Sequence, residues 1–297
     1  MTDMLQFVFA GLALGARYAL VALGFVVIYR ATGVFNFAQG GLVALGAYVA
    51  WYGVDSGLPF VVAVVVAVAA CGLAGALVQP LLLARMVGQP PFTVIMITLG
   101  LLFVIDQMIP TLWGYGTHDL GDPWGLETID AGGVTLAVRD LWTILLAGAA
   151  LGAFFLFVSR SRYGLAMRAV ALDQEAALAQ GISVGRVVAI SWAIAGMVAA
   201  LAGVTLVSGA AGVNPSVSFV ALAAFPAMIV GGLDSPAGAV VGGLLIGVVQ
   251  TLTAAYQPQH ASWLGDGFHA VMPYLVMIVI LLVRPHGLFG TREVRRA

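Results

Sequence analysis

The chain has no lysine, a single cysteine and very little charge of either sign. Its 297 residues include 12 basic side chains, all arginine, and 13 acidic ones, so charged residues are 8% of the sequence and the formal net charge is -1. A soluble domain carries about a quarter charged residues, and a nucleic-acid-binding protein needs a basic patch. The composition therefore excludes an ordinary soluble domain and argues against nucleic-acid binding.

The cysteine and the histidines form no pattern that would bind a metal or make a disulfide. Cys71 has no second cysteine to pair with, and His118, His260, His269 and His286 are scattered without ligand spacing. We expect no metal site and no cofactor bound by this chain. The absence of lysine also excludes a phosphate-binding loop, which needs GK followed by Ser or Thr.

Apolar sequence is abundant, at 62% of the residues. A membrane core of about 30 Å needs about 20 apolar residues in a helix. We expect spans near 5 to 29, 38 to 54, 60 to 84, 92 to 113, 141 to 159, 187 to 208, 218 to 232, 237 to 256 and 268 to 283. The second and seventh are short enough to be broken or re-entrant helices. The prediction is an all-α, polytopic transmembrane helical bundle with eight or nine membrane segments.

The charges divide between the two ends of these spans. Ten arginines fall on one side, whereas eight acidic residues and five tryptophans fall on the other, together with Arg139. Because arginine gathers on the cytoplasmic side of membrane proteins, we expect the N-terminus outside and the C-terminus in the cytoplasm. No basic residue precedes Arg17, so the first span is expected to be a retained helix and not a cleaved signal peptide. The loop from 114 to 140 is expected outside, solvated or in contact with a partner.

Glycines and amides interrupt the apolar sequence at GVFNFAQGG, residues 33 to 41. Unwound backbone at membrane depth is tolerated only where it is buried in protein or lines a cavity, and broken helices often pass polar solutes. We expect Asn36 and Gln39 to line the inner part of a pathway, with a solvated loop as the alternative. Asn214, followed by Pro215, either lines an outer gate or begins an ordinary turn.

Arg17 and Asp106 are the charged residues inside the predicted spans, where charge is costly and usually functional. Three alternatives stay open: an ion pair between the first and fourth helices, an Arg17 that lines the pathway, or two groups that reach the interface separately. Asp234 and Ser235 are expected to cap the following helix. Close helix packing is indicated by GxxxG spacings at Gly11 and Gly15, Gly148 and Gly152, Gly238 and Gly242, and Gly243 and Gly247.

Residues 160 to 186, RSRYGLAMRAVALDQEAALAQGISVGR, form a charged island between two apolar runs. Its apolar side chains recur on neighbouring helical turns, and Gly181 is expected to end the helix. So polar a segment must lie in water on one side of the membrane. It either docks into a groove of a partner or lies among the lipid headgroups as an amphipathic helix.

Within the island, EAALAQG resembles the cytoplasmic EAA loop of ABC importer permeases, and RAVALDQEAALAQGISVGR resembles that loop in the branched-chain amino acid permeases. Three more stretches resemble the same permeases in the same order: ALVALGFVVIYRATGVFNFAQGG, VGGLDSPAGAVVGGLLIGVVQ and RPHGLFG. The resemblance implies one permease domain over residues 1–297, multi-pass in a bacterial inner membrane. It implies an ATPase-coupling segment at 160 to 186, with Arg168, Asp173, Glu175, Ala176, Ala177 and Gly181 as its coupling residues.

The resemblance also implies partners: a second related permease, two cytoplasmic ATPase subunits that hydrolyse the ATP, and a periplasmic substrate-binding protein. The expected function is import of branched-chain or related hydrophobic amino acids, by a chain that is not an enzyme. The expected pathway residues are Arg17, Asn36, Gln39 and Asn214.

Alternative functions stay open at this point. A urea or short-amide importer is one, because Gln39 and Gly41 stand where His and Glu are commoner in the family. An ion-coupled secondary transporter would need titratable groups near the midplane, and Arg17 and Asp106 suit that role poorly. An intramembrane enzyme would need a catalytic constellation within the helices, which the sequence does not show.

Overall fold

Long helices make up most of the computed structural model, which describes residues 2–86, 89–125, 127–131, 134–209, 212–265 and 267–291. Within these residues, six helices are long and apolar enough to cross a membrane. They are α1 (Thr2–Thr32), α3 (Phe60–Leu81) with the 3-10 turn η1 (Leu83–Met86), α4 (Pro91–Trp113), α5 (Val138–Arg160), α8 (Val184–Val207) and α10 (Pro236–His260).

Three shorter apolar segments occupy the remaining predicted spans. They are α2 (Gln39–Asp55), the 3-10 turn η2 (Pro215–Phe219) followed by α9 (Val220–Gly231), and α11 (Phe268–Val283). All nine predicted spans are therefore helical, and their ends differ from the prediction by a few residues. The apolar runs determine these helices because a backbone in lipid must satisfy its hydrogen bonds within the segment.

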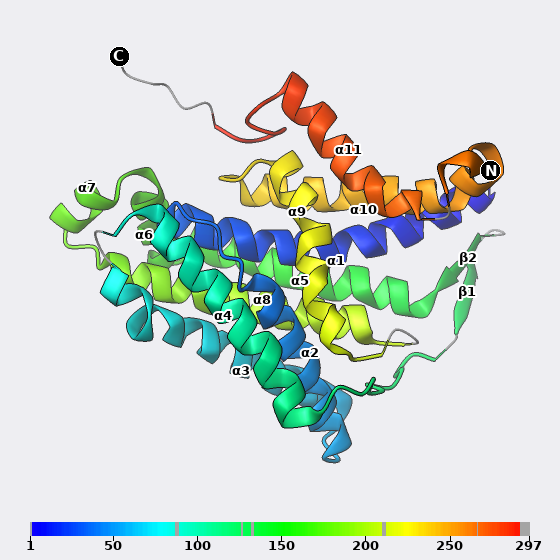
Figure 1. Cartoon of the computed structure of the whole chain (residues 1–297), viewed down its shortest axis with the longest axis horizontal. Helices are drawn as coiled ribbons and strands as arrows, with labels where there is room; N and C mark the ends of the chain where they lie inside the picture. The colour runs from blue at the N-terminus through cyan, green and yellow to red at the C-terminus, as the bar shows by residue number, and fades with distance from the viewer. Residues whose placement is uncertain are drawn as a thin grey trace.

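The two most buried long helices, α1 and α8, form the centre of the bundle. In Figure 1, α1 runs along the long axis of the molecule, and it packs most extensively against α10 and α8. Glycine makes the first contact possible, since a methyl group added at Gly15 would come within 2.6 Å of the Cα of Leu244. Three of the four GxxxG pairs lie at helix contacts of this kind. Gly148 and Gly152 do not, because that stretch of α5 faces open space.

The loop between α4 and α5 departs from an all-α fold. Strands β1 (Thr128–Ala131) and β2 (Val134–Ala137) form an antiparallel hairpin in which Thr128 pairs with Ala137. The β-branched residues of these strands favour extended backbone. These short strands contain no long apolar run, so the pattern that predicts membrane spans could not indicate them.

Figure 1 places this hairpin at the opposite end of the long axis from two short helices, α6 (Arg162–Leu172) and α7 (Gln174–Ala179). The charged island was expected to be a single helix that ends at Gly181. It is two helices, because the side chain of Asp173 accepts a hydrogen bond from the backbone N–H of Ala176 at 2.9 Å and starts a new helix. Gly181, at φ +80°, follows the second helix.

Candidate functional site

A cavity of about 200 Å³ lies where α1, α4, α9 and α11 meet. Its walls are mainly apolar, with Phe25, Phe37, Leu102, Phe219, Leu222 and Phe225 among the residues that line it. Three polar side chains reach it: Asp106 from α4, Ser218 from η2 and Tyr274 from α11. A mostly apolar hollow with a few convergent polar groups is the usual form of a small-molecule site.

The broken segment between α1 and α2 forms part of this cavity wall, through Phe37 and Gly40. Asn36 and Gln39, the residues predicted to line a pathway, are fully buried beside it. The Oδ1 of Asn36 accepts a hydrogen bond from the N–H of Ala38 at 3.0 Å, and its Nδ2 donates to the Oε1 of Gln39 at 3.4 Å. These two amides hold the break in the helix, and neither of them lines the cavity.

Gln39 ties the break to the centre of the bundle as well. Its Nε2 donates to the backbone carbonyl of Ala195 on α8 at 3.3 Å. From the other side, the hydroxyl of Thr98 on α4 accepts a hydrogen bond from the N–H of Phe37 at 3.2 Å. The position of Phe37 on the cavity is therefore fixed by α4 and α8 together.

Asn214 occupies the start of η2. Its Oδ1 accepts a hydrogen bond from the N–H of Ser216 at 3.0 Å, so it caps the turn, as the Asn-Pro pair indicated for an ordinary turn. This turn carries Ser218 and Phe219 to the cavity. Asn214 thus positions cavity residues without lining the cavity itself.

One alternative was an ion pair between Arg17 and Asp106, and the structure does not contain it. Its Nη2 lies 3.5 Å from the Oδ1 of Asp140 and 3.4 Å from the hydroxyl of Thr143, both on α5. Helix α5 begins at Val138, earlier than predicted, and so brings Asp140 into the bundle beside α1. Among the described residues, the group that donates to the Oδ2 of Asp106 is the hydroxyl of Ser218, in a long hydrogen bond of 3.4 Å.

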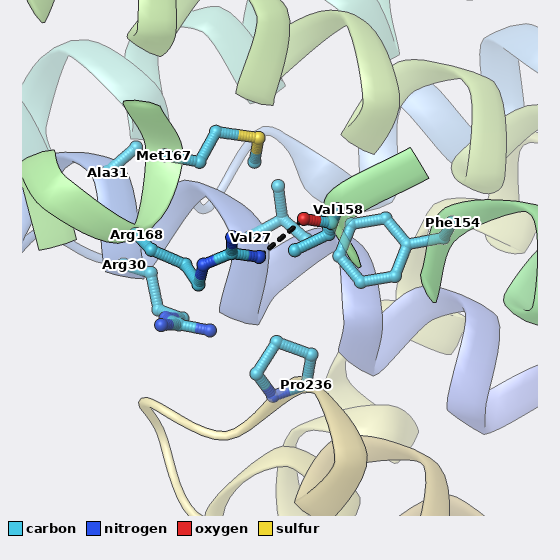
Figure 2. Close-up of a pocket in the computed structure, with 8 residues that line it drawn as sticks. All are labelled: Val27, Arg30, Ala31, Phe154, Val158, Met167, Arg168 and Pro236. Atoms are coloured by element: carbon cyan, nitrogen blue, oxygen red, sulfur yellow. Dashed lines mark hydrogen bonds between the residues drawn. The ribbon is translucent and has the colours of Figure 1, made fainter. Parts of the chain in front are cut away.

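The predicted coupling residues lie on α6 and α7 and at their ends. Arg168 donates to the carbonyl of Val158 at 2.5 Å, which fastens α6 against the end of α5. In Figure 2 this hydrogen bond is the dashed line, and Arg30 points into the same small pocket beside Pro236. Ala177 is buried, whereas Glu175, Ala176 and Gly181 are exposed to solvent.

Helix α7 also contacts the end of α1 directly. The Nε2 of Gln174 donates to the carbonyl of Ala31 at 3.0 Å, two residues before the broken segment. Nothing in the sequence singles out Gln174, because a glutamine in a charged segment has many possible partners. A mainly apolar pocket of about 430 Å³ lies beside this contact, between α7, the start of α8 and the ends of α1, α3 and α4.

The RPHGLFG segment packs against the turn before α10. The N–H groups of Leu288 and Phe289 donate to the carbonyls of Val230 and Gly231 at 2.8 and 3.0 Å. Asp234 accepts from the N–H of Thr291 at 3.1 Å. Asp234 therefore anchors this segment.

The predicted helix cap at the start of α10 is Ser235 alone. Its Oγ accepts a hydrogen bond from the N–H of Gly238 at 3.0 Å. Among the described residues, no three metal-ligating side chains gather in one place.

Comparison with known proteins gives one consistent result. Residues 7–282 match the family described as branched-chain amino acid transport system, permease component. The permease LivH of Escherichia coli K12 is 30% identical, over 98% of this chain and 97% of that protein. The permease BraD of Pseudomonas aeruginosa is 28% identical, over 98% and 97% of the two chains.

A solved structure supports the fold alone. PsaBC from Streptococcus pneumoniae, in complex with Fab, superposes with a TM-score of 0.51 at 14% identity and covers 94% of this chain and 92% of that chain. The superposed structure agrees with a helical membrane fold, and the family match and the LivH relatives agree on the family. This chain is therefore a multi-pass membrane protein that belongs to the family of branched-chain amino acid transport permeases.

Proposed function

We propose that this chain is the permease subunit of an ATP-driven importer for branched-chain or related hydrophobic amino acids. Residues 1–297 form one permease domain, whose pathway passes the cavity between α1, α4, α9 and α11. The relatives named LivH and BraD are high-affinity branched-chain amino acid permeases, which supports this solute class. The apolar wall of the cavity suits a solute with a hydrocarbon side chain.

The observation that carries the proposal is the exposed coupling segment, residues 160 to 186. Its helices α6 and α7 lie at one end of the bundle and present Leu172, 89% exposed, and Leu178, 58% exposed. Exposed leucines beside the charge of Glu175 form a surface suited to a groove on another protein. We assign this surface to the ATPase subunits.

The coupling residues divide into two groups by their contacts. Arg168, Asp173 and Ala177 stabilise the two helices. Arg168 bonds to the end of α5, Asp173 caps α7, and Ala177 is the buried side chain of α7. Glu175 and Ala176 face outward and would meet the ATPase. Gly181 adopts a positive φ, which permits the chain to turn toward α8.

A continuous set of contacts joins this segment to the cavity. Gln174 on α7 bonds to Ala31 at the end of α1. The chain then passes directly through the broken segment to Phe37 and Gly40 on the cavity wall. When ATP closes the ATPase pair, a shift of α7 would therefore move the cavity wall, which is the kind of two-state change that alternating access requires.

The remaining partners follow from the same proposal. A second related permease forms the other half of the pathway, a periplasmic binding protein delivers the solute, and two cytoplasmic subunits hydrolyse the ATP. This chain holds no nucleotide itself, because it has no lysine for a phosphate-binding loop. The arginines at the coupling end support a cytoplasmic location for that end and for the C-terminus, with the N-terminus outside.

Copurification from the native membrane tests this proposal against an ion-coupled transporter. A tagged chain should bring ATPase subunits with it, and Glu175→Arg should remove them. The matched control is Glu127→Arg, the same charge reversal on an exposed residue at the opposite end, which should retain the ATPase. An unmutated chain that purifies without any ATPase would contradict the proposal.

A further inference from the structure

Asp106 is the acidic side chain on the wall of the cavity between α1, α4, α9 and α11. It lies well inside the membrane-spanning helix α4 and is partly buried. Among the described residues, no cationic group comes within ion-pair distance of its carboxylate. The hydrogen bond that its carboxylate accepts from the hydroxyl of Ser218 is, at 3.4 Å, long for a bond to a charged acceptor.

A carboxylate in apolar surroundings is costly unless a cation or several hydrogen-bond donors satisfy it. Here the surroundings are apolar: Phe37, Phe219 and Leu222 line the same cavity. Arg17 is paired with Asp140 and so does not supply the missing cation. None of the described residues supplies a cation to this carboxylate, which leaves it free to bind one carried by a solute.

The other polar groups of the cavity show what kind of cation would fit. The hydroxyl of Tyr274 donates to the carbonyl of Leu222 at 3.1 Å, so its oxygen lone pairs stay available to accept. The hydroxyl of Ser218 and the carboxylate of Asp106 are further acceptors on the wall of the same cavity. A primary ammonium group carries three donors and no acceptor, which complements such a set.

We propose that Asp106 binds the protonated α-amino group of the solute as it passes through this cavity, while the phenylalanine and leucine side chains contact its hydrocarbon side chain. This inference rests on the proposed function and specifies its solute as one with a free amino group. Asp106 is then a substrate-binding residue. Residues of α4, η2, α9 and α11 line the cavity, so a solute there would contact all of these segments.

Uptake of radiolabelled L-leucine by cells that express the complete transporter tests the inference. Asp106→Asn keeps the size of the side chain and removes its charge, and should raise the KM for leucine uptake about 10- to 100-fold. Asp106→Glu, which keeps the charge, should restore much of the loss. The control is Gln107→Asn on the neighbouring residue, which bonds to Tyr115 outside the cavity and should leave KM unchanged.

A second readout examines the permease directly. With Cys71 replaced by alanine, a cysteine in place of Leu102 on the cavity wall should be protected from a thiol reagent by L-leucine. It should not be protected by 4-methylpentanoate, which has the same hydrocarbon chain and carboxylate but no amino group. Equal protection by both compounds would overturn the inference.

The two hypotheses fail in different ways. If the unmutated complex takes up no leucine, the proposed function fails and the inference fails with it. If the unmutated complex takes up leucine and Asp106→Asn does so with the same KM, the inference alone is wrong. Loss of the partner permease from purified Asp106→Asn would also overturn it, since Asp106 would then belong to a subunit contact.

Discussion

At the scale of single residues, the polar groups in the membrane region are mostly tied to the protein itself. Asn36 and Gln39 are fully buried and bonded to each other and to backbone groups. Their predicted effect on transport is therefore indirect, through the position of Phe37 on the cavity wall. Sequence alone marked these residues as unusual, because amides are rare in apolar runs. It could not indicate which way their side chains point.

Replacing Asn36 by leucine should slow uptake by about one to two orders of magnitude. The change leaves the buried N–H of Ala38 and the Oε1 of Gln39 without partners, at about 1 to 3 kcal/mol for each unsatisfied group. Initial rates of leucine uptake measure the effect, and copurified ATPase subunits should stay unchanged as the assembly control. Ordinary rates in an Asn36→Leu, Gln39→Leu double variant would show that the break has no part in transport.

The pair of Arg17 and Asp140 should be structural. Both side chains are mostly buried, 18% and 15% exposed, so Asp140→Asn alone would leave a largely desolvated guanidinium unpaired. We expect a loss of about 1 to 2 kcal/mol in the free energy of unfolding for that single change. Arg17→Gln combined with Asp140→Asn should recover much of it.

A double-mutant cycle on unfolding in detergent measures this coupling. Uptake by the double variant distinguishes a structural role of Arg17 from a role in lining the pathway. Normal uptake with recovered stability supports the structural role, whereas lost uptake with recovered stability would show that Arg17 lines the pathway. The sequence could not name Asp140 as the partner, because the start of α5 was predicted one turn too late.

At the scale of helices and strands, the sequence predicted the apolar helices well, since all nine predicted spans are helical. Long apolar runs set these segments, and lipid leaves the backbone few alternatives to helix. The prediction failed where that constraint is absent: the hairpin β1–β2 and the break at Asp173 both lie in polar sequence. There a local hydrogen bond, such as the cap on α7, decides the conformation.

Glycine at the contact of α1 with α10 should be essential to the bundle. A methyl group at Gly15 would lie 2.6 Å from the Cα of Leu244, so Gly15→Ala should cost about 1 to 3 kcal/mol of stability through overpacking. The matched control is Gly148→Ala, which meets nothing within 4 Å. It should be neutral or stabilising, by up to about 1 kcal/mol, because alanine favours helix more than glycine.

The chain supplies its own reporter for this comparison. Cys71 is fully buried and is the lone cysteine, so a thiol-reactive dye should label it only as the bundle opens on heating. Gly15→Ala should lower the labelling temperature, and Gly148→Ala should not. Equal shifts for the two variants would mean that the GxxxG spacing has no special role at α1.

At the scale of the whole molecule, the two ends of the bundle differ in character. The hairpin lies at one end and the coupling segment at the other. The sequence predicted this polarity from its arginines, because their distribution needs only the order of the spans. It did not predict which helices pair, since any small-residue stripe can meet any other. The central place of α1 and α8 thus came from the structure.

Cysteine labelling tests the orientation of the two ends. Tyr115 is 72% exposed just beyond α4 and Leu172 is 89% exposed on α6, so a cysteine at either position should be reachable from its own side. With Cys71 changed to alanine, we expect an impermeant thiol reagent to label Tyr115→Cys in intact cells. Leu172→Cys should react only after the cells are opened. The reverse pattern would contradict the topology.

The central claim is that this permease moves a hydrophobic amino acid at the expense of ATP consumed by its partners. The most direct measurement is L-leucine uptake into proteoliposomes that contain the chain with its partner permease and ATPase subunits, with binding protein added outside. We predict uptake only when ATP is inside and binding protein is present, and its loss with Glu175→Arg but not with Glu127→Arg. Uptake that follows a proton or sodium gradient in the absence of ATP would contradict the account.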